Sequence, residues 1–341
     1  MTEASLFEQQ RANRKRSTVI VGIFVLFFAW VGFGGDLAFY LSTIDASPPS
    51  YRHVVPWFGI ATTIFALILV WRAWQTGPKK VLWSTGAWQL VEPSTEKERV
   101  LVNVVEEMAI ASGLPRPTIW IVPDKDPNAF ATGMKEGDAH VAVTEGLLET
   151  LSRDELQGVV AHEMAHVRNH DMKLMTLLAA LVGVVALISD GAGRMLRGTG
   201  RVRGAGSVRG GGSGGRKGGG AGALALIVLV LWLLTLVIAP LVSRLLALAV
   251  SRKREFLADA TAAQFTRHPA ALAAALRKIE DHAAPTKSIK RGAAHLCIAD
   301  PLGRRVTHKQ GFLADFLATH PPIAVRVARL QRMAYENGRT A

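Results

Sequence analysis

The chain has 341 residues, of which 49% are hydrophobic, and its mean hydropathy of +0.22 is too high for an average soluble protein of this length. Its net charge of +13 comes with basic residues beside apolar runs, as expected where a protein faces an anionic lipid surface. The single cysteine, Cys297, excludes an intrachain disulfide framework and a thiolate zinc site, and it agrees with a reducing compartment. Composition therefore indicates that part of the chain lies in lipid.

Two uncharged runs near the N-terminus predict membrane-spanning helices. Ser17–Gly35 has 19 residues and Val54–Trp71 has 18, and at about 1.5 Å per residue each reaches roughly the 30 Å of a hydrocarbon core. The alternative for the first run is a signal peptide, but the run is longer than an h-region and no small-residue cleavage site follows closely. We therefore expect a basic N-terminus (1–16) and a two-helix membrane anchor (17–75).

Basic residues predict the orientation of this anchor. Four lie within residues 11–16 and three within 72–80, whereas the loop between the runs holds only Arg52. By the positive-inside rule both outer flanks face the cytosol. The segment that follows the anchor is then cytosolic as well.

Two further uncharged runs, Leu174–Ser189 and Ala221–Ser243, are separated by a stretch (191–222) in which 15 of 32 residues are Gly and seven are Arg or Lys. This stretch cannot bury a core and is predicted to be a flexible loop. The alternative is electrostatic binding of RNA or anionic lipid by its basic residues. The stretch lacks aromatic residues for base stacking, so the flexible loop is favoured and no nucleic acid partner is expected. Four membrane segments are favoured, with the loop outside; a re-entrant or surface pair, with the loop inside, is the alternative.

Between the anchor and the third run the pattern is that of a compact α+β segment. Thr95 and Glu98 form a capping pattern for a helix that ends at Gly113. The stretches TIWIV (118–122) and AHVAVT (139–144) predict short strands, with NAFATG (128–133) between them. No Gly-rich loop ending in Lys-Ser/Thr is present, so nothing indicates an ATP-driven motor.

The stretch VVAHEMAHVRNHDM (159–172) contains the arrangement H-E-x-x-H. His162 and His166 are four residues apart, so on a helix both can direct a ring nitrogen at one point, with Glu163 beside it. Two imidazoles suit zinc, and the carboxylate can take a proton from a water molecule that the metal activates. The alternative is a helix that carries ordinary histidines.

A helix is supported by a capping pattern at Ser152–Glu155. It is supported further by an apolar stripe formed by Leu156, Val159, Val160, Met164 and Val167.

A catalytic zinc needs a third protein ligand. The metzincin pattern requires a histidine six residues after His166, where Met172 stands, and His170 lies too far along the helix axis. In SRKREFLADA, Glu255 and Asp259 share a helix face. Glu255 would complete a His-His-Glu site, and Asp259 would accept the second ring N–H of a ligand histidine. The alternative is an exposed helix of mixed charge.

In their order and spacing, these motifs resemble the HtpX-type membrane zinc metalloproteases, which are gluzincins related to the CAAX prenyl proteases. The resemblance includes AHLCIADPL (294–302) and THPPIAVRVARL (319–330) and extends from the first anchor helix to about residue 333. The departures are His170 and a long Gly/Arg-rich loop. The resemblance implies a mainly α fold with a small β-sheet (α+β), in a multi-pass membrane protein. Its gluzincin-like protease domain would comprise 76–173 and 251–341, separated by the hydrophobic pair and loop of 174–250.

The resemblance implies roles for individual residues. His162, His166 and Glu255 would bind one zinc ion per chain, and Glu163 would be the general base and then the proton donor. Asp259 would orient a ligand histidine, His162 in the first place.

Three further residues receive roles in the same way. Asn128 would lie on an edge strand that binds an extended substrate peptide. His320 and Arg326 would stabilise the oxyanion of the tetrahedral intermediate. For this pair the alternative is helix capping by THPP, with Arg326 in a salt bridge.

The function implied is that of a membrane-anchored, ATP-independent zinc endopeptidase. It would act in a bacterial-type cytoplasmic (inner) membrane on membrane or misfolded proteins, from the cytosolic side, in protein quality control. Its partners would be protein substrates and the lipid bilayer, and a homo-oligomer is compatible with the sequence. A CAAX-type processing protease is an alternative that would need more spans than four. A non-enzymatic scaffold with structural histidines is another, against which Glu163 and Glu255 argue.

Overall fold

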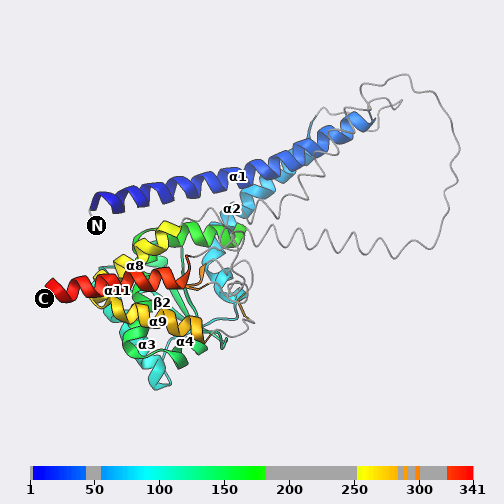
Figure 1. The fold of residues 1–341 in the computed structure, drawn as a ribbon. Helices are drawn as coiled ribbons and strands as arrows, with labels where there is room; N and C mark the ends of the chain where they lie inside the picture. Colours follow the sequence, from blue (N-terminus) through cyan, green and yellow to red (C-terminus); the bar gives the residue numbers. More distant parts are fainter. Residues whose placement is uncertain are drawn as a thin grey trace. The chain divides into compact units, whose positions relative to one another are not determined.

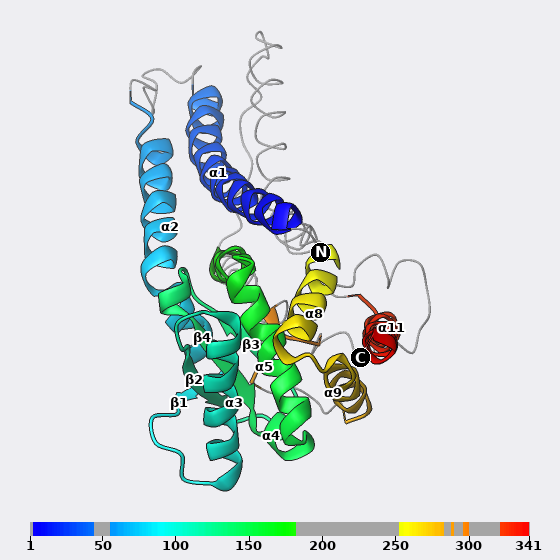
Figure 2. The same cartoon turned by 90° about the vertical axis from the view of Figure 1, so that its left-hand side faces the viewer.

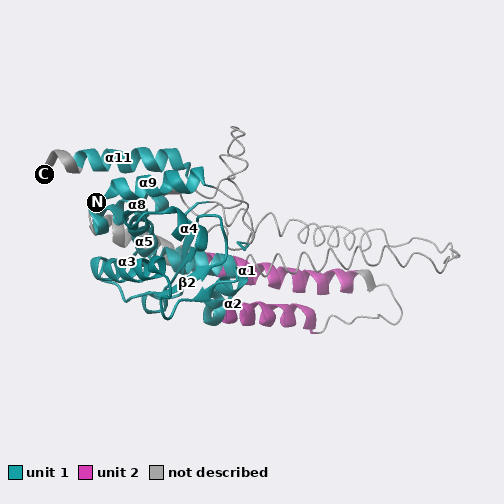
Figure 3. Ribbon diagram, turned by 90° about the horizontal axis from the view of Figure 1, so that it is seen from below, with its two compact units in different colours: residues 1–18, 73–180, 246–341 teal, residues 19–72, 181–245 magenta. Residues whose placement is uncertain are grey.

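The computed structural model describes residues 3–43, 55–181, 252–282, 288–289, 296–299 and 321–340. The chain divides into two compact units, one of residues 1–18, 73–180 and 246–341 and one of residues 19–72 and 181–245 (Figure 3). The Gly/Arg-rich loop, the fourth apolar run and His320 lie outside the described residues, as does the third run beyond its helical residues 174–181.

In the part of the chain that the structure describes, residues 19–72 belong to two long helices, α1 (Glu3–Thr43) and α2 (Trp57–Ser84), and to the segment between them (Figure 1). Both are longer than the uncharged runs that predicted them. The second helix begins directly after Pro56, and proline is tolerated at a helix start because the first N–H groups of a helix have no intrahelical partner. Asp36 of α1 accepts the backbone N–H of Gly59 of α2 at 2.7 Å. A Cβ on Gly32 would lie 2.7 Å from the Gly59 Cα, so this close approach requires glycine.

These helices provide two segments, Ser17–Leu41 and Trp57–Ser84, that are long and apolar enough to cross a membrane. Within the described part of the chain, only 22% and 17% of their most apolar windows are buried. A core helix of a soluble protein would be mostly buried, whereas these helices expose large apolar side chains such as Leu26 and Leu67. Both helices are therefore consistent with membrane anchoring.

The other unit contains a four-stranded sheet with the order β1-β2-β4-β3. Its strands are β1 (Trp88–Gln89), β2 (Thr118–Val122), β3 (Ala129–Thr132) and β4 (His140–Thr144). The central strands β2 and β4 are parallel, and β3 pairs with β4 in antiparallel fashion at the edge. The predicted strands at 118–122 and 139–144 are confirmed. The two-residue strand β1 is too short to give an alternating pattern and was not predicted.

Helix α5 (Arg153–Arg168) is the centre of this unit and packs against the sheet through β3 (Figure 2). Its other neighbours are α3 (Glu96–Ser112), α8 (Arg252–Thr266) and α9 (Pro269–Asp281). A Cβ on Gly158 would lie 2.9 Å from backbone atoms of Leu272, so this glycine allows α9 to approach α5 closely. Further helical elements among the described residues are α4 (Glu145–Thr150), the 3-10 turn η1 (Glu136–Asp138), the helical residues 171–181 and α11 (Ile323–Thr340).

The predicted capping signals have their expected effects. Thr95 and Glu98 form a capping box at the start of α3, and Gly113 ends that helix in the left-handed region with φ 67°. At the start of α5, the Glu155 carboxylate accepts the Ser152 N–H at 2.7 Å. The mostly helical unit with its small mixed sheet confirms the α+β prediction.

Candidate metal centre

Helix α5 presents two histidines and a glutamate to the interior of the unit. All five members of its predicted apolar stripe are buried. His162 and Glu163 are buried with them, and the His166 side chain is 14% exposed. One turn of helix separates the two histidines, whose rings lie 4.7 Å apart between centroids. The helix therefore places two imidazoles and a carboxylate in one water-poor region.

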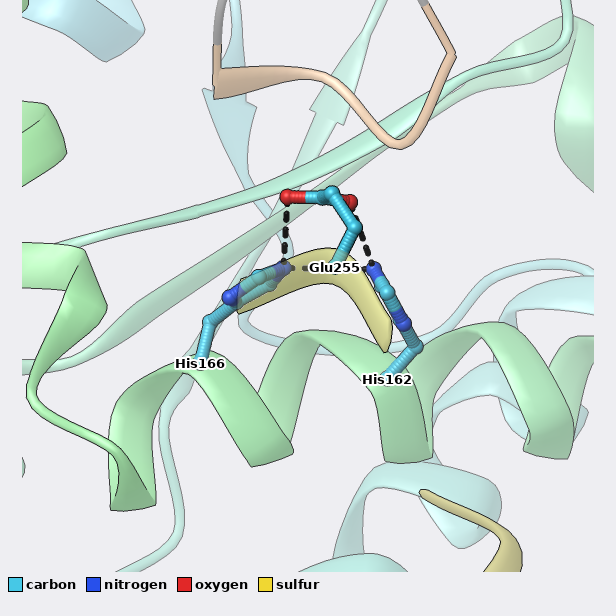
Figure 4. A group of neighbouring side chains, drawn as sticks. All are labelled: His162, His166 and Glu255. Atoms are coloured by element: carbon cyan, nitrogen blue, oxygen red, sulfur yellow. Dashed lines mark hydrogen bonds and ion pairs between the residues drawn. The ribbon is translucent and has the colours of Figure 1, made fainter. Parts of the chain in front are cut away.

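Helix α8 packs on α5 and brings Glu255 to the two histidines (Figure 4). The His162 and His166 Nε2 atoms are 3.2 Å apart. The Glu255 Oε2 lies 3.6 Å from the His162 Nε2, and its Oε1 lies 3.7 Å from the His166 Nε2. These three residues form a candidate metal site, with one ligand atom from each within 4.8 Å of the others.

The spacing of these atoms suits zinc. A tetrahedral zinc ion about 2.0–2.2 Å from nitrogen and oxygen ligands separates those ligands by roughly 3.3–3.6 Å. The observed separations of 3.2, 3.6 and 3.7 Å lie close to that range, with Glu255 approaching His162 through Oε2 and His166 through Oε1. Two imidazoles and one carboxylate are also the donor set of a catalytic zinc site with a position open for water. The residues present therefore fit the metal.

The charges around the candidate site favour a cation. Six further buried ionisable groups belong to or surround it, namely the carboxylates of Glu163, Asp171, Glu255 and Asp259 and the guanidinium groups of Arg254 and Arg326. When all are ionised, two negative charges remain, which a divalent cation would neutralise. Burial and Arg326 lower the pKa of His162, but its contacts with Asp259 and Glu255 outweigh them and raise that pKa to about 9. The surroundings thus stabilise positive charge at this point.

Asp259 lies behind His162, as its spacing from Glu255 predicted. The Asp259 Oδ1 is 3.0 Å from the His162 Nδ1. Arg326 donates to both Asp259 oxygens, from Nε at 2.9 Å and from Nη2 at 2.7 Å, and also to the Ile298 carbonyl at 2.9 Å. Burial alone would raise the pKa of Asp259, but the Arg326 guanidinium holds it below its usual range. The His162 ring is therefore backed by an ionised carboxylate.

Arg326 thus has the salt bridge that the sequence offered as an alternative to an oxyanion role. It is fully buried, and its donors are directed at Asp259 and Ile298. Its Nη2 lies 3.4 and 3.3 Å from the two His162 ring nitrogens, and such similar distances place it against the ring face. This placement favours the salt-bridge alternative, and the oxyanion role of Arg326 stays a prediction.

The polar groups of Asn128 are also engaged. Asn128 is fully buried, its Nδ2 donates to the Ala299 carbonyl at 2.9 Å, and its Oδ1 accepts the Ala299 N–H at 3.4 Å. These bonds attach residues 296–299 to the start of β3. The edge position of this strand was expected, but the Asn128 side chain itself supports the neighbouring segment.

Asp171 and Arg254 were not assigned by the sequence. The Asp171 Oδ2 lies 3.1 Å from the His166 Nδ1, and its Oδ1 lies 3.7 Å from the Arg254 Nη1. The sequence could have indicated them only by their positions close to proposed ligands. Asp171 follows His166 by five residues, and Arg254 directly precedes Glu255. His170 is outside α5 and lies 3.8 Å from Glu136.

Glu163 differs from its neighbours because neither carboxylate oxygen has a hydrogen-bond partner among the described residues. It is 1% exposed, and burial raises its pKa above the usual range. Buried carboxylates without partners are rare in proteins and point to a bound water or ion. Glu163 also lines a small cavity with His166 and Glu255, whose remaining walls are Ala131, Met172, Met175 and Leu296.

Comparison with known proteins agrees with this geometry. The model of peptidase family M48 matches residues 95–334. A protease HtpX homologue of Caldanaerobacter subterraneus subsp. tengcongensis is 35% identical over 98% of this chain and 99% of its own length. One from Tropheryma whipplei strain Twist is 44% identical over 68% of this chain and 72% of its own. The crystal structure of S. mikatae Ste24p matches 92% of this chain and 66% of its own, with 17% identity and a TM-score of 0.44.

The family match spans β2, β3, β4, α5, α8 and most of α11, and so includes every residue of the candidate metal site. The Caldanaerobacter relative aligns over 98% of this chain. The chain therefore belongs to peptidase family M48 and is a metallopeptidase.

Proposed function

We propose that this protein is a membrane-anchored zinc endopeptidase in which His162, His166 and Glu255 hold the metal. The observation that carries this proposal is the convergence of two imidazoles and the Glu255 carboxylate beside a second buried carboxylate, Glu163, which has no hydrogen-bond partner among the described residues. When bound, zinc supplies Lewis-acid chemistry, because it lowers the pKa of a water molecule towards about 7 and polarises a peptide carbonyl.

Glu163 performs the proton transfers in this proposal. Its burial makes the carboxylate a better proton acceptor than an exposed glutamate, because it is not stabilised by solvent. It takes a proton from the attacking water and later gives that proton to the leaving amine. Asp259 and Arg326 hold the His162 ring in place.

The edge strand β3 is the proposed substrate platform. The Asn128 carbonyl accepts the Thr144 N–H at 2.9 Å, so by antiparallel alternation Ala129 and Ala131 direct their N–H and C=O groups away from β4. The Ala129 carbonyl accepts the Ile298 N–H, whereas Ala131 lines the cavity that also contains Glu163. An extended peptide would pair with β3 at Ala131 rather than with the Asn128 side chain.

The proposed substrates are membrane or misfolded proteins, cleaved from the cytosolic side in protein quality control without ATP hydrolysis. Support comes from the basic flanks of the anchor helices and from the apolar helices themselves. A multi-pass arrangement in a bacterial cytoplasmic membrane follows if both helices span. Sulfhydryl labelling of a cysteine placed at exposed Gln89 tests the orientation. Labelling by an impermeant reagent in intact cells would contradict the cytosolic side.

Metal analysis and proteolysis of the full chain in detergent test the chemistry. Wild type should contain about one zinc per chain, and Glu255→Ala should lose it because a ligand is removed. Glu163→Gln should keep the metal but cleave casein about 10² to 10⁴-fold more slowly, because it has no proton acceptor. Glu145→Gln, at an exposed glutamate of α4, is the matched control and should behave as wild type.

Two results would contradict the proposal. Cleavage by zinc-loaded Glu163→Gln within about tenfold of wild type would remove Glu163 as the base. Wild type without stoichiometric zinc and without proteolysis would instead favour a scaffold with structural histidines.

A further inference from the structure

The two histidines of the proposed metal site have matching surroundings on the sides that face away from it. Each ring directs Nε2 at the site, and each Nδ1 lies about hydrogen-bond distance from a buried carboxylate, 3.0 Å for one and 3.1 Å for the other. Each carboxylate also faces a fully buried arginine. The two sets are His162–Asp259–Arg326 and His166–Asp171–Arg254.

The position of Asp171 depends on a local backbone feature. In a continuous helix a residue five positions after His166 would be rotated about 140° away from it. Helix α5 ends at Arg168, and His170 adopts φ 56°, a left-handed conformation that is unusual for a residue other than glycine. The helix is interrupted there, and helical residues 171–181 begin at Asp171. This interruption allows the Asp171 carboxylate to lie beside the His166 ring.

We propose that Asp171, held by Arg254, is a positioning residue that fixes the orientation and proton of His166 for metal binding. The inference rests on the proposed metal role of His166. With its Nδ1 proton shared with Asp171, the ring has its Nε2 lone pair available to the metal and is a more basic ligand. Arg254 carries the charge opposite to that of Asp171 and directly precedes Glu255 on α8. The packing of α8 therefore places both the third proposed ligand, Glu255, and the partner of Asp171.

Arg254 is itself held inside the fold. It is fully buried, and its Nη2 lies 3.2 Å from the Met175 Sδ, on the same helical segment as Asp171. The guanidinium group therefore joins the residues after α5 to the start of α8. A purely structural alternative follows from this: Asp171 could serve only to begin the helix 171–181.

Asp171→Asn separates the two explanations. Asparagine has nearly the size of aspartate and keeps a side-chain oxygen that can accept N–H groups of the first helical turn, so this change largely preserves a role in starting the helix. It removes the negative charge, and its amide NH₂ can donate to the Nδ1 and favour the wrong ring tautomer. Zinc affinity of the full chain in detergent, measured by competition with a chelator, should fall about 10 to 100-fold.

Asp259→Asn is the comparator, and its zinc affinity should fall by a similar factor. Asp124→Asn is the negative control, since Asp124 is buried and accepts the N–H groups of Asp126 and Ser288. Its zinc affinity should equal that of wild type. The visible absorption bands of bound Co²⁺ provide a second readout and should shift in Asp171→Asn but not in Asp124→Asn.

The double variant Asp171→Asn/Arg254→Met guards against a general loss of folding. Removing both charges avoids an unpaired buried arginine, so the thermal unfolding midpoint should recover relative to the single variant. Zinc affinity should remain weak, because His166 still lacks its carboxylate.

Wild-type zinc affinity in Asp171→Asn would overturn the inference, as would recovery of affinity together with stability in the double variant. A wild-type chain that binds no zinc would instead overturn the proposed function.

Discussion

Helix α5 buries charged and polar side chains, whereas the helix pair α1–α2 exposes large apolar side chains. Helix α5 encloses His162 and Glu163, whereas α1 and α2 leave Leu26 and Leu67 exposed. In α5 the polar groups lie among oppositely charged neighbours and a site suited to a cation, which offset the cost of removing them from water. In α1 and α2 the exposed apolar side chains are those expected of helices covered by lipid. Whether a side chain is buried therefore depends on the groups that surround it and not on its hydrophobicity alone.

The buried charges of the α5 region should be the most sensitive to change. Arg326→Met leaves Asp259 buried without its partner and should lower the free energy of unfolding by about 3–5 kcal/mol. Urea unfolding of the full chain in detergent, with metal removed by a chelator, measures this directly. Arg332→Met on the exposed end of α11 is the matched control, and about 0.5 kcal/mol or less is expected there. Equal losses would show that burial does not distinguish the two arginines.

The exposed apolar surface of α1 can be compared with an equally exposed residue elsewhere. Leu26→Lys near the middle of the first span should cost about 2.5–3.5 kcal/mol of membrane insertion. Ile110→Lys on α3, a residue that is 79% exposed, should change stability by no more than about 0.5 kcal/mol. Insertion is measured as the fraction that resists alkaline extraction from membranes. If both variants insert as wild type, lipid does not surround Leu26.

The solvated end of α5 should show the smallest effect. Glu155 accepts from Lys278 at 2.7 Å, and the Lys278 side chain is 42% exposed. Burial would raise the pKa of Glu155, but the bonds from Lys278 and Ser152 lower it overall. Because the folded pKa is below the unfolded value, the stabilisation is present above about pH 4.5 and is lost as the pH falls through the folded pKa.

Glu155→Gln should therefore cost about 0.5–1 kcal/mol at pH 7, and its stability should approach that of wild type in acid. Thermal unfolding between pH 3 and 7 measures the difference, with Glu96→Gln at the exposed Glu96–Arg99 pair as control. A difference that persists unchanged at low pH would contradict the ionic origin.

Local patterns predicted much of the protease unit. Thr95 and Gly113 marked the ends of α3, and TIWIV marked β2, because capping and alternation depend on neighbouring residues. The bounds of α1 and α2 were underestimated, since helices continue through polar flanks that carry no apolar signal.

The sequence by itself determined that His162, Glu163 and His166 share one region of a helix, because 3.6 residues per turn fix their relative directions. Only the tertiary structure decided which distant residues meet them. Glu255 reaches the histidines because α8 packs on α5. Asp171 lies beside His166 because His170 adopts a left-handed conformation. This conformation is uncommon for residues other than glycine, so the sequence did not predict it. Arg326 forms a buried salt bridge with Asp259 because α11 brings its side chain to that carboxylate. Which groups form a buried ion pair depends on how distant helices pack, and local sequence does not show this.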